Sequence, residues 1–214
     1  MNLVRWSWIG DNTGLLIEKS LEHVHLAGLA MLFGFLIAFP LALAAVHWPR
    51  MYAPSLAATG VAFTIPSLAL FILLIPFTGL SVATSLIGLT IYTLLILFRN
   101  IVAGFNGVPR DISEAARAMG YTRLRQLFTV ELPVALPVIM AGVRIAAVTT
   151  IGLVTVTALI GQGGLGQLFI TGFTLHRTTP LVVGFVLSVA LAVVVDLALV
   201  GLLWLMTPWR RGRE

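Results

Sequence analysis

Two long stretches of this chain contain no charged side chain. Residues 51–98 hold no Asp, Glu, Lys or Arg, and neither do residues 145–176. A soluble domain of ordinary composition interrupts its apolar segments with charges far more often. Hydrophobic residues make up 59% of the 214 residues, charged residues make up 10%, and the mean hydropathy is +1.04. The chain is therefore predicted to be an integral membrane protein, because lipid tolerates such uncharged runs.

Five stretches are long and apolar enough to cross a bilayer as helices. A helix needs about 20 apolar residues to cross roughly 30 Å of hydrocarbon. The strict alternation typical of barrel strands is absent, so the predicted fold class is all-α, a polytopic membrane helix bundle. The predicted spans are Val24–Val46, Ala53–Phe77, Val82–Phe98, Leu136–Ile160 and Leu181–Met206.

Basic residues are distributed unevenly between the two sides of these spans. The positive-inside rule places the richer side in the cytoplasm, so the N-terminus is expected outside and the C-terminus inside. The arginines are spread over separate loops, which disfavours nucleic-acid binding as the reason for the basic excess. The richer side holds Arg50, Arg99, Arg110, Arg117, Arg123, Arg125, Arg210, Arg211 and Arg213; the poorer side holds Arg5, Lys19 and Arg177.

The chain divides into three predicted parts on this topology. Residues 1–23 form an extracytoplasmic segment at the membrane interface, where Trp6 and Trp8 suit the headgroup region, and they lack the basic start and cleavage site of a signal peptide. Residues 24–206 form the transmembrane domain, which includes a cytoplasmic loop at 99–133. Residues 207–214 form a basic cytoplasmic tail.

The stretch EAARAMGYTRLRQLFTVELP, residues 114–133, is a polar and basic interruption that we call the elbow. Asp111 followed by Glu114 has capping-box spacing, which predicts a helix from about Ile112. Gly120 suits the left-handed position after a helix end. Between them lie three helix-forming residues with almost no side chain, Ala115, Ala116 and Ala118.

A second short helix is predicted after this glycine. Thr122 can cap it, and Pro133 is expected to end the segment. Helices this short are marginal in water, so a soluble partner is expected to supply packing for the elbow. The apolar residues predicted to share one face are Leu124, Leu127 and Phe128; those predicted to lie elsewhere are Arg123, Arg125 and Gln126.

The spacing of the elbow resembles the signature loop of permease subunits of binding-protein-dependent ABC importers. The shared pattern is Glu-Ala-Ala at 114–116, Gly120 after three further residues, an aliphatic residue after nine more, and Leu-Pro at 132–133 after one more. This chain departs from it only in having Val130 where isoleucine is usual. The resemblance implies that the short helix sits in a groove of a cytoplasmic ATPase and passes its closure to the spans. The implied coupling residues are Glu114, Ala115, Ala116, Gly120, Leu132 and Pro133. Simple capping and helix-stop roles are the alternative.

A finer resemblance covers most of residues 24–206. FTIPSLALFILLIP at 63–76, EAARAMG followed by VELPVALPVIMAGVRIA, and ALIGQGGLGQLF at 158–169 are similar to the osmoprotectant branch of these importers. That branch imports glycine betaine, choline, carnitine and proline betaine. Methionine importers share the five-span fold and the elbow, so they are the nearest alternative.

The resemblance also implies partners in a bacterial or archaeal plasma membrane. Since the sequence contains no Walker motif, ATP and Mg are expected in a separate pair of ATPase subunits, and this chain is expected to be a transport subunit without cofactors of its own. A second permease, identical or homologous, and an extracytoplasmic substrate-binding protein complete the expected assembly in the lipid bilayer. An ion-driven secondary transporter and a non-transporting scaffold are the rival functions.

Several polar residues inside the spans are candidates for the translocation pathway. Pro66 is expected to kink the second span and free the carbonyl of Ala62, and a plain packing kink is the alternative. In the fourth span, hydroxyls can hydrate a solute or bond to their own backbone. The candidate pathway residues are Thr64, Pro66, Ser67, Thr149, Thr150 and Asp196.

A glycine-rich segment follows the fourth span. It lacks the strand and the lysine of a phosphate-binding loop, so a flexible external turn is predicted, serving as an outer gate or as a contact with the binding protein. The candidate gate residues are Gly161, Gly163, Gly164 and Gly166; Gly142 and Gly152, within the span, are expected to allow close helix approach.

Two charges are predicted to lie within the membrane. Asp196 could steer a cationic solute, pair with Arg144 or be protonated, and the sequence leaves these three open. Arg144 is expected to snorkel toward the cytoplasmic headgroups. His23 and His25 diverge on a helix and the chain has no cysteine, so no metal site is predicted.

Overall fold

The computed structural model describes residues 4–210, and in this range the chain is helical with no strand. Arg211 and Arg213, part of the predicted basic tail, lie outside the described residues. The elements are α1 (Trp6–Asp11), α2 (Thr13–His47), α3 (Pro49–Thr64), α4 (Ser67–Thr78), α5 (Val82–Asn106), α6 (Arg110–Ala118), α7 (Arg123–Gln126), the π-helical turn η1 (Leu127–Glu131), α8 (Leu132–Val154), the 3-10 helix η2 (Thr155–Ile160), α9 (Gly166–Thr174), α10 (Thr178–Met206) and the 3-10 turn η3 (Pro208–Arg210).

The predicted membrane helix bundle is confirmed. Among the described residues, α2, α5, the continuous segment Arg123–Ile160 and α10 are each long and apolar enough to cross a membrane. A fifth candidate span is the pair α3 and α4, which is bent by 96° at its break. This gives four or five spans, in agreement with the sequence.

The break between α3 and α4 corrects the prediction of a kinked helix at Pro66. α3 ends at Thr64, Ile65 is extended (φ −64°, ψ 128°), and Pro66 stands before the first residue of α4. A proline pushes the residue before it out of helical geometry, and in this extended conformation the carbonyl of Ile65 accepts from the Tyr92 hydroxyl of α5. The chain therefore changes direction between α3 and α4 where a continuous span was expected.

The first long helix, α2, also begins earlier than predicted. It starts at Thr13 instead of Val24 and has 35 residues, which gives a length of about 52 Å. Its polar first turns carry their own ion pair, because Lys19 Nζ lies 2.8 Å from Glu22 Oε2 at i,i+3 spacing. The helix is longer than a bilayer is thick, so it extends past the hydrocarbon.

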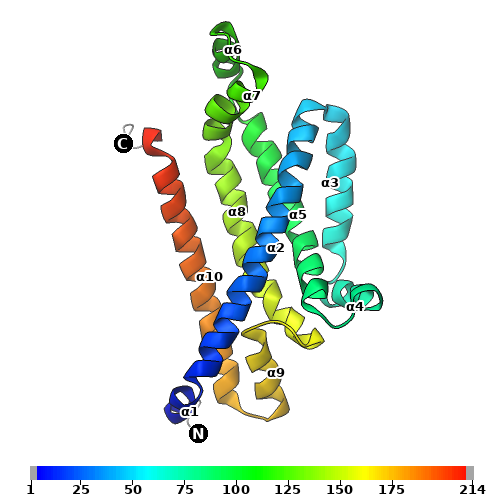
Figure 1. Cartoon of the computed structure of the whole chain (residues 1–214), viewed down its shortest axis with the longest axis vertical. Coiled ribbons are helices and arrows are strands. Elements are labelled where there is room, and N and C mark those ends of the chain that lie inside the picture. Colours follow the sequence, from blue (N-terminus) through cyan, green and yellow to red (C-terminus); the bar gives the residue numbers. More distant parts are fainter. Residues whose placement is uncertain (1–3, 211–214) are drawn as a thin grey trace.

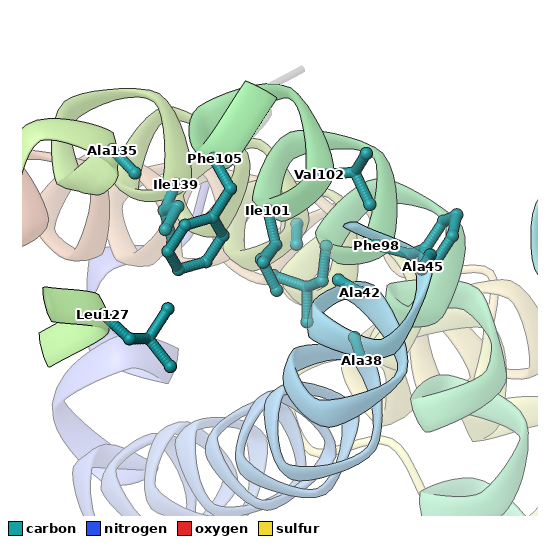
Figure 2. Packing of buried hydrophobic residues seen from close by; sticks show 12 residues of the cluster. Ala38, Ala42, Ala45, Phe98, Ile101, Val102, Phe105, Leu127, Ala135 and Ile139 are labelled. Atoms are coloured by element: carbon teal, nitrogen blue, oxygen red, sulfur yellow. The ribbon is translucent and has the colours of Figure 1, made fainter. Parts of the chain in front are cut away.

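The core of the bundle lies where α2, α5 and α8 meet. Three small residues of α2, Ala38, Ala42 and Ala45, let the larger side chains of α5 approach closely. Figure 2 shows Leu127 pointing from η1 toward Phe105 of α5 and its neighbours. This contact anchors the elbow in the core of the bundle.

Gly142 and Gly152 behave differently at the crossing of α8 with its neighbours. A Cβ at Gly142 would lie 2.2 Å from Cβ of Asn100 on α5, so the predicted close approach is confirmed there. A Cβ at Gly152 would meet nothing within 4 Å, and the prediction is wrong at that position. Only one of the two glycines faces another helix.

The elbow and the glycine-rich segment lie at opposite ends of the bundle. In Figure 1, α6 and α7 stand at one end together with the last turns of α10, while α1 and α9 stand at the other. The described basic connections cluster near the elbow end, as the sequence expects of a cytoplasmic side. The orientation in the membrane stays a prediction.

Candidate functional site

The first helix of the elbow, α6, begins at Arg110 and not at Ile112. Pro109 has extended backbone (φ −59°, ψ 138°) and precedes the helix with no side-chain cap, so the predicted capping box of Asp111 and Glu114 is wrong. Pro109 starts the helix two residues earlier than the acidic pair would. Asp111 then lies in the first turn, where a negative charge still suits the helix N-terminus.

Gly120 ends α6 as predicted. Its φ is +79°, in the left-handed region that favours glycine. The N–H of Gly120 donates to the carbonyl of Arg117 (2.9 Å), and the N–H of Tyr121 donates to the carbonyl of Ala116 (3.2 Å). These two bonds form a Schellman motif, which fixes the direction in which the chain leaves α6.

The second helix of the elbow begins as predicted but does not end where expected. The Thr122 hydroxyl accepts from the N–H of Arg125 at 3.4 Å, which confirms the cap. The chain then passes through η1 into α8 without a break, and Leu132 before Pro133 keeps helical angles (φ −60°, ψ −47°). Pro133 is the second residue of α8, and the helical segment Arg123–Ile160 continues through it. The predicted stop at Pro133 is therefore wrong.

The side chains of α7 and η1 that face inward differ from the prediction. Leu127 is buried, but Leu124 and Phe128 are 70% and 53% exposed, so the predicted common face is wrong. Gln126, expected on the outer side, is 4% exposed. The π turn holds more residues per turn than an α-helix, so it moves Phe128 off the 3.6-residue spacing, whereas Leu124 and Gln126 precede it in α7.

A hydrogen-bonded group of four side chains lies inside the elbow. Gln126 Nε2 donates to Glu131 Oε1 at 2.7 Å, and the Ser113 hydroxyl donates to the same oxygen at 3.2 Å. Arg117 Nε donates to Gln126 Oε1 at 3.4 Å. Beside this group is a polar cavity of about 520 Å³ that reaches His47 at the end of α2. No local sequence pattern predicts this group.

The outer surface of the elbow is open and partly apolar. Met119 is 68% exposed, and Glu114 and Ala115 are exposed as well. Ala116 is 1% exposed and faces the interior of the elbow. Met119, Leu124 and Phe128 therefore expose large apolar side chains at the end of the bundle, as expected of a docking surface.

The hydroxyl groups proposed for the pathway bond mainly to their own helices. Thr64 Oγ1 donates to the carbonyl of Val61 at 2.7 Å, and Thr150 Oγ1 donates to that of Ala146 at 2.7 Å. Thr150 is buried, while Thr149 and Ser67 are half-buried. Local backbone bonding is the alternative that the sequence left open.

Asp196 pairs with Arg144 across α8 and α10. Arg144 Nε lies 2.7 Å from Asp196 Oδ1, and Arg144 Nη2 lies 2.8 Å from Oδ2, which makes the pair bidentate. This selects one of the three roles left open for Asp196, and it corrects the snorkelling expected of Arg144. The two residues are 52 positions apart, so the register of α8 against α10 decides the contact.

The glycine-rich segment is tightly packed rather than flexible, which corrects the sequence interpretation. Gly161, Gly163 and Gly164 have φ of +82°, +118° and +49°. A Cβ at Gly164 would lie 2.7 Å from Cβ of His23 on α2, and a Cβ at Gly166 would lie 2.4 Å from the carbonyl oxygen of Thr155. The neighbouring backbone leaves no room for side chains at Gly163, Gly164 and Gly166, whereas a Cβ at Gly161 would meet nothing within 4 Å.

Three residues of α2 hold this segment, and none of them was assigned this role from the sequence. Glu22 Oε1 accepts from the N–H of Gly164 at 3.2 Å, and Lys19 holds the other carboxylate oxygen. His23 is fully buried, and its Nε2 lies 2.9 Å from the carbonyl oxygen of Ile151 on α8. These contacts fasten α2 to both ends of the turn from α8 to α9.

Comparison with known proteins decides the family. Residues 30–203 match the family described as "Binding-protein-dependent transport system inner membrane component". The chain belongs to this family. The permease is thus a component of an ABC importer and a multi-pass protein of the plasma membrane, and the family consists of transport subunits rather than enzymes.

Two curated relatives match the permease along nearly its whole length. The osmoprotectant import permease protein OsmW of Salmonella typhimurium is 36% identical over 203 residues, covering 92% of this chain and 94% of the relative. The carnitine transport permease protein OpuCB of Listeria monocytogenes is 34% identical over 206 residues, covering 95% and 94%.

The fold of the permease is also found in solved importers. The inward-facing MetNI methionine ABC transporter matches with a TM-score of 0.80 at 24% identity, covering 91% of this chain and 97% of that one. This likeness concerns the fold.

Proposed function

We propose that the permease carries quaternary-amine osmolytes such as glycine betaine, choline and carnitine across the membrane. The observation that carries this proposal is the naming of its full-length relatives, which are 31–36% identical and are described as permeases for glycine betaine, carnitine, choline or osmoprotectants. The motifs at 63–76 and 158–169 agree with the same branch. ATP and Mg bind the partner ATPase pair, and an external binding protein captures the solute.

The elbow is proposed to couple ATP hydrolysis to transport. It projects from the end of the bundle, and its outer surface exposes Glu114, Ala115 and large apolar side chains. Its last residues run without interruption into α8 through Leu132 and Pro133. Force that a bound partner exerts on α6 is therefore passed to the spanning helix α8.

Reconstitution of the complete importer tests the substrate and the energy source together. Proteoliposomes that hold the permease, its ATPase and its binding protein are expected to accumulate labelled glycine betaine, choline or carnitine with ATP, and not with a non-hydrolysable analogue. Methionine serves as the competing solute, because methionine and amino-acid importers share the fold. Methionine uptake in place of betaine uptake would reject the substrate class.

An ion-driven carrier is the second candidate, and its support is weak. An acidic relay would use Asp196, but Arg144 Nε and Nη2 each donate to one oxygen of that carboxylate. Uptake that ignores nucleotide and follows an imposed ion gradient would favour this candidate.

Replacing Gly120 by valine is expected to uncouple the importer. The left-handed φ of +79° costs a β-branched residue about 1–2 kcal/mol, so the turn from α6 to α7 changes direction. We expect ATP-driven uptake to fall by about tenfold, the factor that ~1.4 kcal/mol represents. Gly79→Val is the control, because Gly79 (φ +69°, ψ −172°) also has a backbone that strains valine, and it lies in open space away from the elbow. Equal loss in both variants would contradict the role of the elbow.

A further inference from the structure

The helix α6 has few connections to the rest of the molecule. Its main packing contacts, among the described residues, are with α7 and η1, and it stands at the end of the bundle in Figure 1. The side chain that α6 buries is the small Ala116. Apolar packing is therefore a weak link between α6 and the spans, and any force on α6 must pass through its polar contacts with α7 and η1.

Those polar contacts form a continuous chain of three side-chain hydrogen bonds that begins and ends on α6, which we call the polar clamp. Its members are Ser113 and Arg117 on α6, Gln126 on α7 and Glu131 on η1. Gln126 is its centre, because its amide nitrogen donates to Glu131 (2.7 Å) while its amide oxygen accepts from Arg117 (3.4 Å). Both ends of one amide are thus used to join α6 to the entrance of α8.

Burial makes Gln126 sensitive to replacement. It is 4% exposed and lines the polar cavity together with Arg117 and Glu131, and its amide bonds to both of them, so its removal breaks the connection between the two. An apolar side chain of equal length would fill the same space but leave Glu131 without its shortest hydrogen bond. The geometry of α6 relative to η1 would then depend on the weaker Ser113 contact at 3.2 Å.

Glu131 occupies the position where the elbow becomes a spanning helix. It is the last residue of η1, and α8 begins at the next residue. At the other end of the same turn, Leu127 is inserted into the core between α2, α5 and α8 (Figure 2). Inserted π turns are often found at functional positions, and this one connects the clamp to both the core and α8.

We propose that Gln126 and Glu131 are positioning residues of the coupling mechanism. The polar clamp makes α6 and the start of α8 move as one rigid body, so that ATPase closure at α6 reaches the membrane as motion of α8. This inference rests on the proposed function, since it describes how the elbow transmits force once an ATPase holds it. Neither residue belongs to the sequence motif that marks the elbow.

The clamp predicts a specific pattern in three variants of the complete reconstituted importer. Gln126→Met keeps the volume and removes the bonds, and Glu131→Gln weakens them. The double variant Gln126→Glu with Glu131→Gln, which we call the exchange variant, again places an amide donor opposite a carboxylate acceptor. The measured quantity is solute transported per ATP hydrolysed, together with the affinity for the ATPase. We expect the Gln126→Met ratio to fall by about fivefold or more with the affinity unchanged, and the exchange to recover most of it.

A second measurement reports rigidity without any transport. The chain has no cysteine, so spin labels can be placed on Ala118→Cys of α6 and Val138→Cys of α8 in otherwise intact permease in lipid nanodiscs. We expect a narrow distance distribution in the parent, a broad one in Gln126→Met and a narrow one again in the exchange variant. This readout also detects a permease that has simply failed to fold, because such a sample is broad in every variant.

The outcomes separate failure of the clamp from failure of the proposed function. One outcome is nucleotide-driven uptake in the parent together with an unchanged amount of solute transported per ATP hydrolysed in Gln126→Met. This outcome would overturn the clamp and leave the proposed function standing. An equally narrow distance distribution in all variants would do the same. Parent uptake that ignores nucleotide would overturn the proposed function, and the transmitting role of the clamp with it.

Discussion

Replacing Gly163 by alanine is expected to destabilise the permease by about 3 kcal/mol, the sum of backbone strain and overpacking. The φ of Gly163 is +118°, which L side chains rarely adopt. An added Cβ would lie 2.4 Å from the backbone nitrogen of Ala158, 2.8 Å from its Cα and 2.9 Å from the carbonyl oxygen of Val154. These are backbone atoms of η2 and α8, so no side-chain rotation can relieve the contact. Denaturant or thermal unfolding of the purified permease in detergent measures the loss.

Gly161 provides the matched control for this prediction. It lies in the same segment with a φ of +82°, but an added Cβ would meet nothing within 4 Å. Gly161→Ala is therefore expected to cost about 1 kcal/mol, from the backbone conformation alone. Equal losses in the two variants would show that packing against η2 does not hold the glycine-rich segment, and would restore the flexible turn that the sequence suggested.

Removing either member of the Arg144–Asp196 pair is expected to damage the permease more than removing both. Each single replacement by leucine leaves one charge without its partner between two spanning helices, whereas the double replacement leaves an apolar contact. The measurement is a double-mutant cycle of folded yield and thermal stability in detergent. Arg144→Lys is expected to restore little, because an ammonium group cannot occupy both carboxylate oxygens in the fork geometry.

The position of this pair explains why it is expected to matter. Along α10, the described buried residues end at Gly184, and side chains further on, such as Leu197 and Leu205, are exposed. Leu191, Ala192 and Val195 are only partly buried against the core beside Asp196, so the ion pair adds a directed polar contact between α8 and this part of α10. Strictly additive losses in the cycle would mean that the two side chains act independently, and that α10 is held by other contacts.

The sequence predicted those features of the elbow that depend on neighbouring residues. Gly120 and Thr122 were identified correctly because a left-handed C-terminal residue and a hydroxyl N-cap have strong local signals. The predicted capping box is wrong because Pro109, just upstream, starts the helix at Arg110 without a side-chain cap. The π turn has no recognisable local signal, and the burial of Gln126 depends on its contacts with Arg117 and Glu131, which local patterns do not show.

The long-range contacts of the site were beyond local reasoning. Glu22 meets Gly164 across 142 positions, and Asp196 meets Arg144 across 52, so both contacts depend on how whole helices are registered. The sequence offered Arg144 as one of three choices for Asp196 and could not select it. Only packing of α8 against α10 does so.

Cross-linking from the elbow tests the central claim most directly. Because the chain has no cysteine, a single cysteine can be placed at exposed Ala115 on α6, with Thr174→Cys on α9, exposed at the opposite end of the bundle, as the control. In membranes that hold the assembled importer, a short cysteine-to-amine cross-linker is expected to join Ala115→Cys to the ATPase, with a yield that changes on adding ATP, and to leave Thr174→Cys unlinked. An assembled, active importer in which Ala115→Cys forms no link to the ATPase would contradict the account.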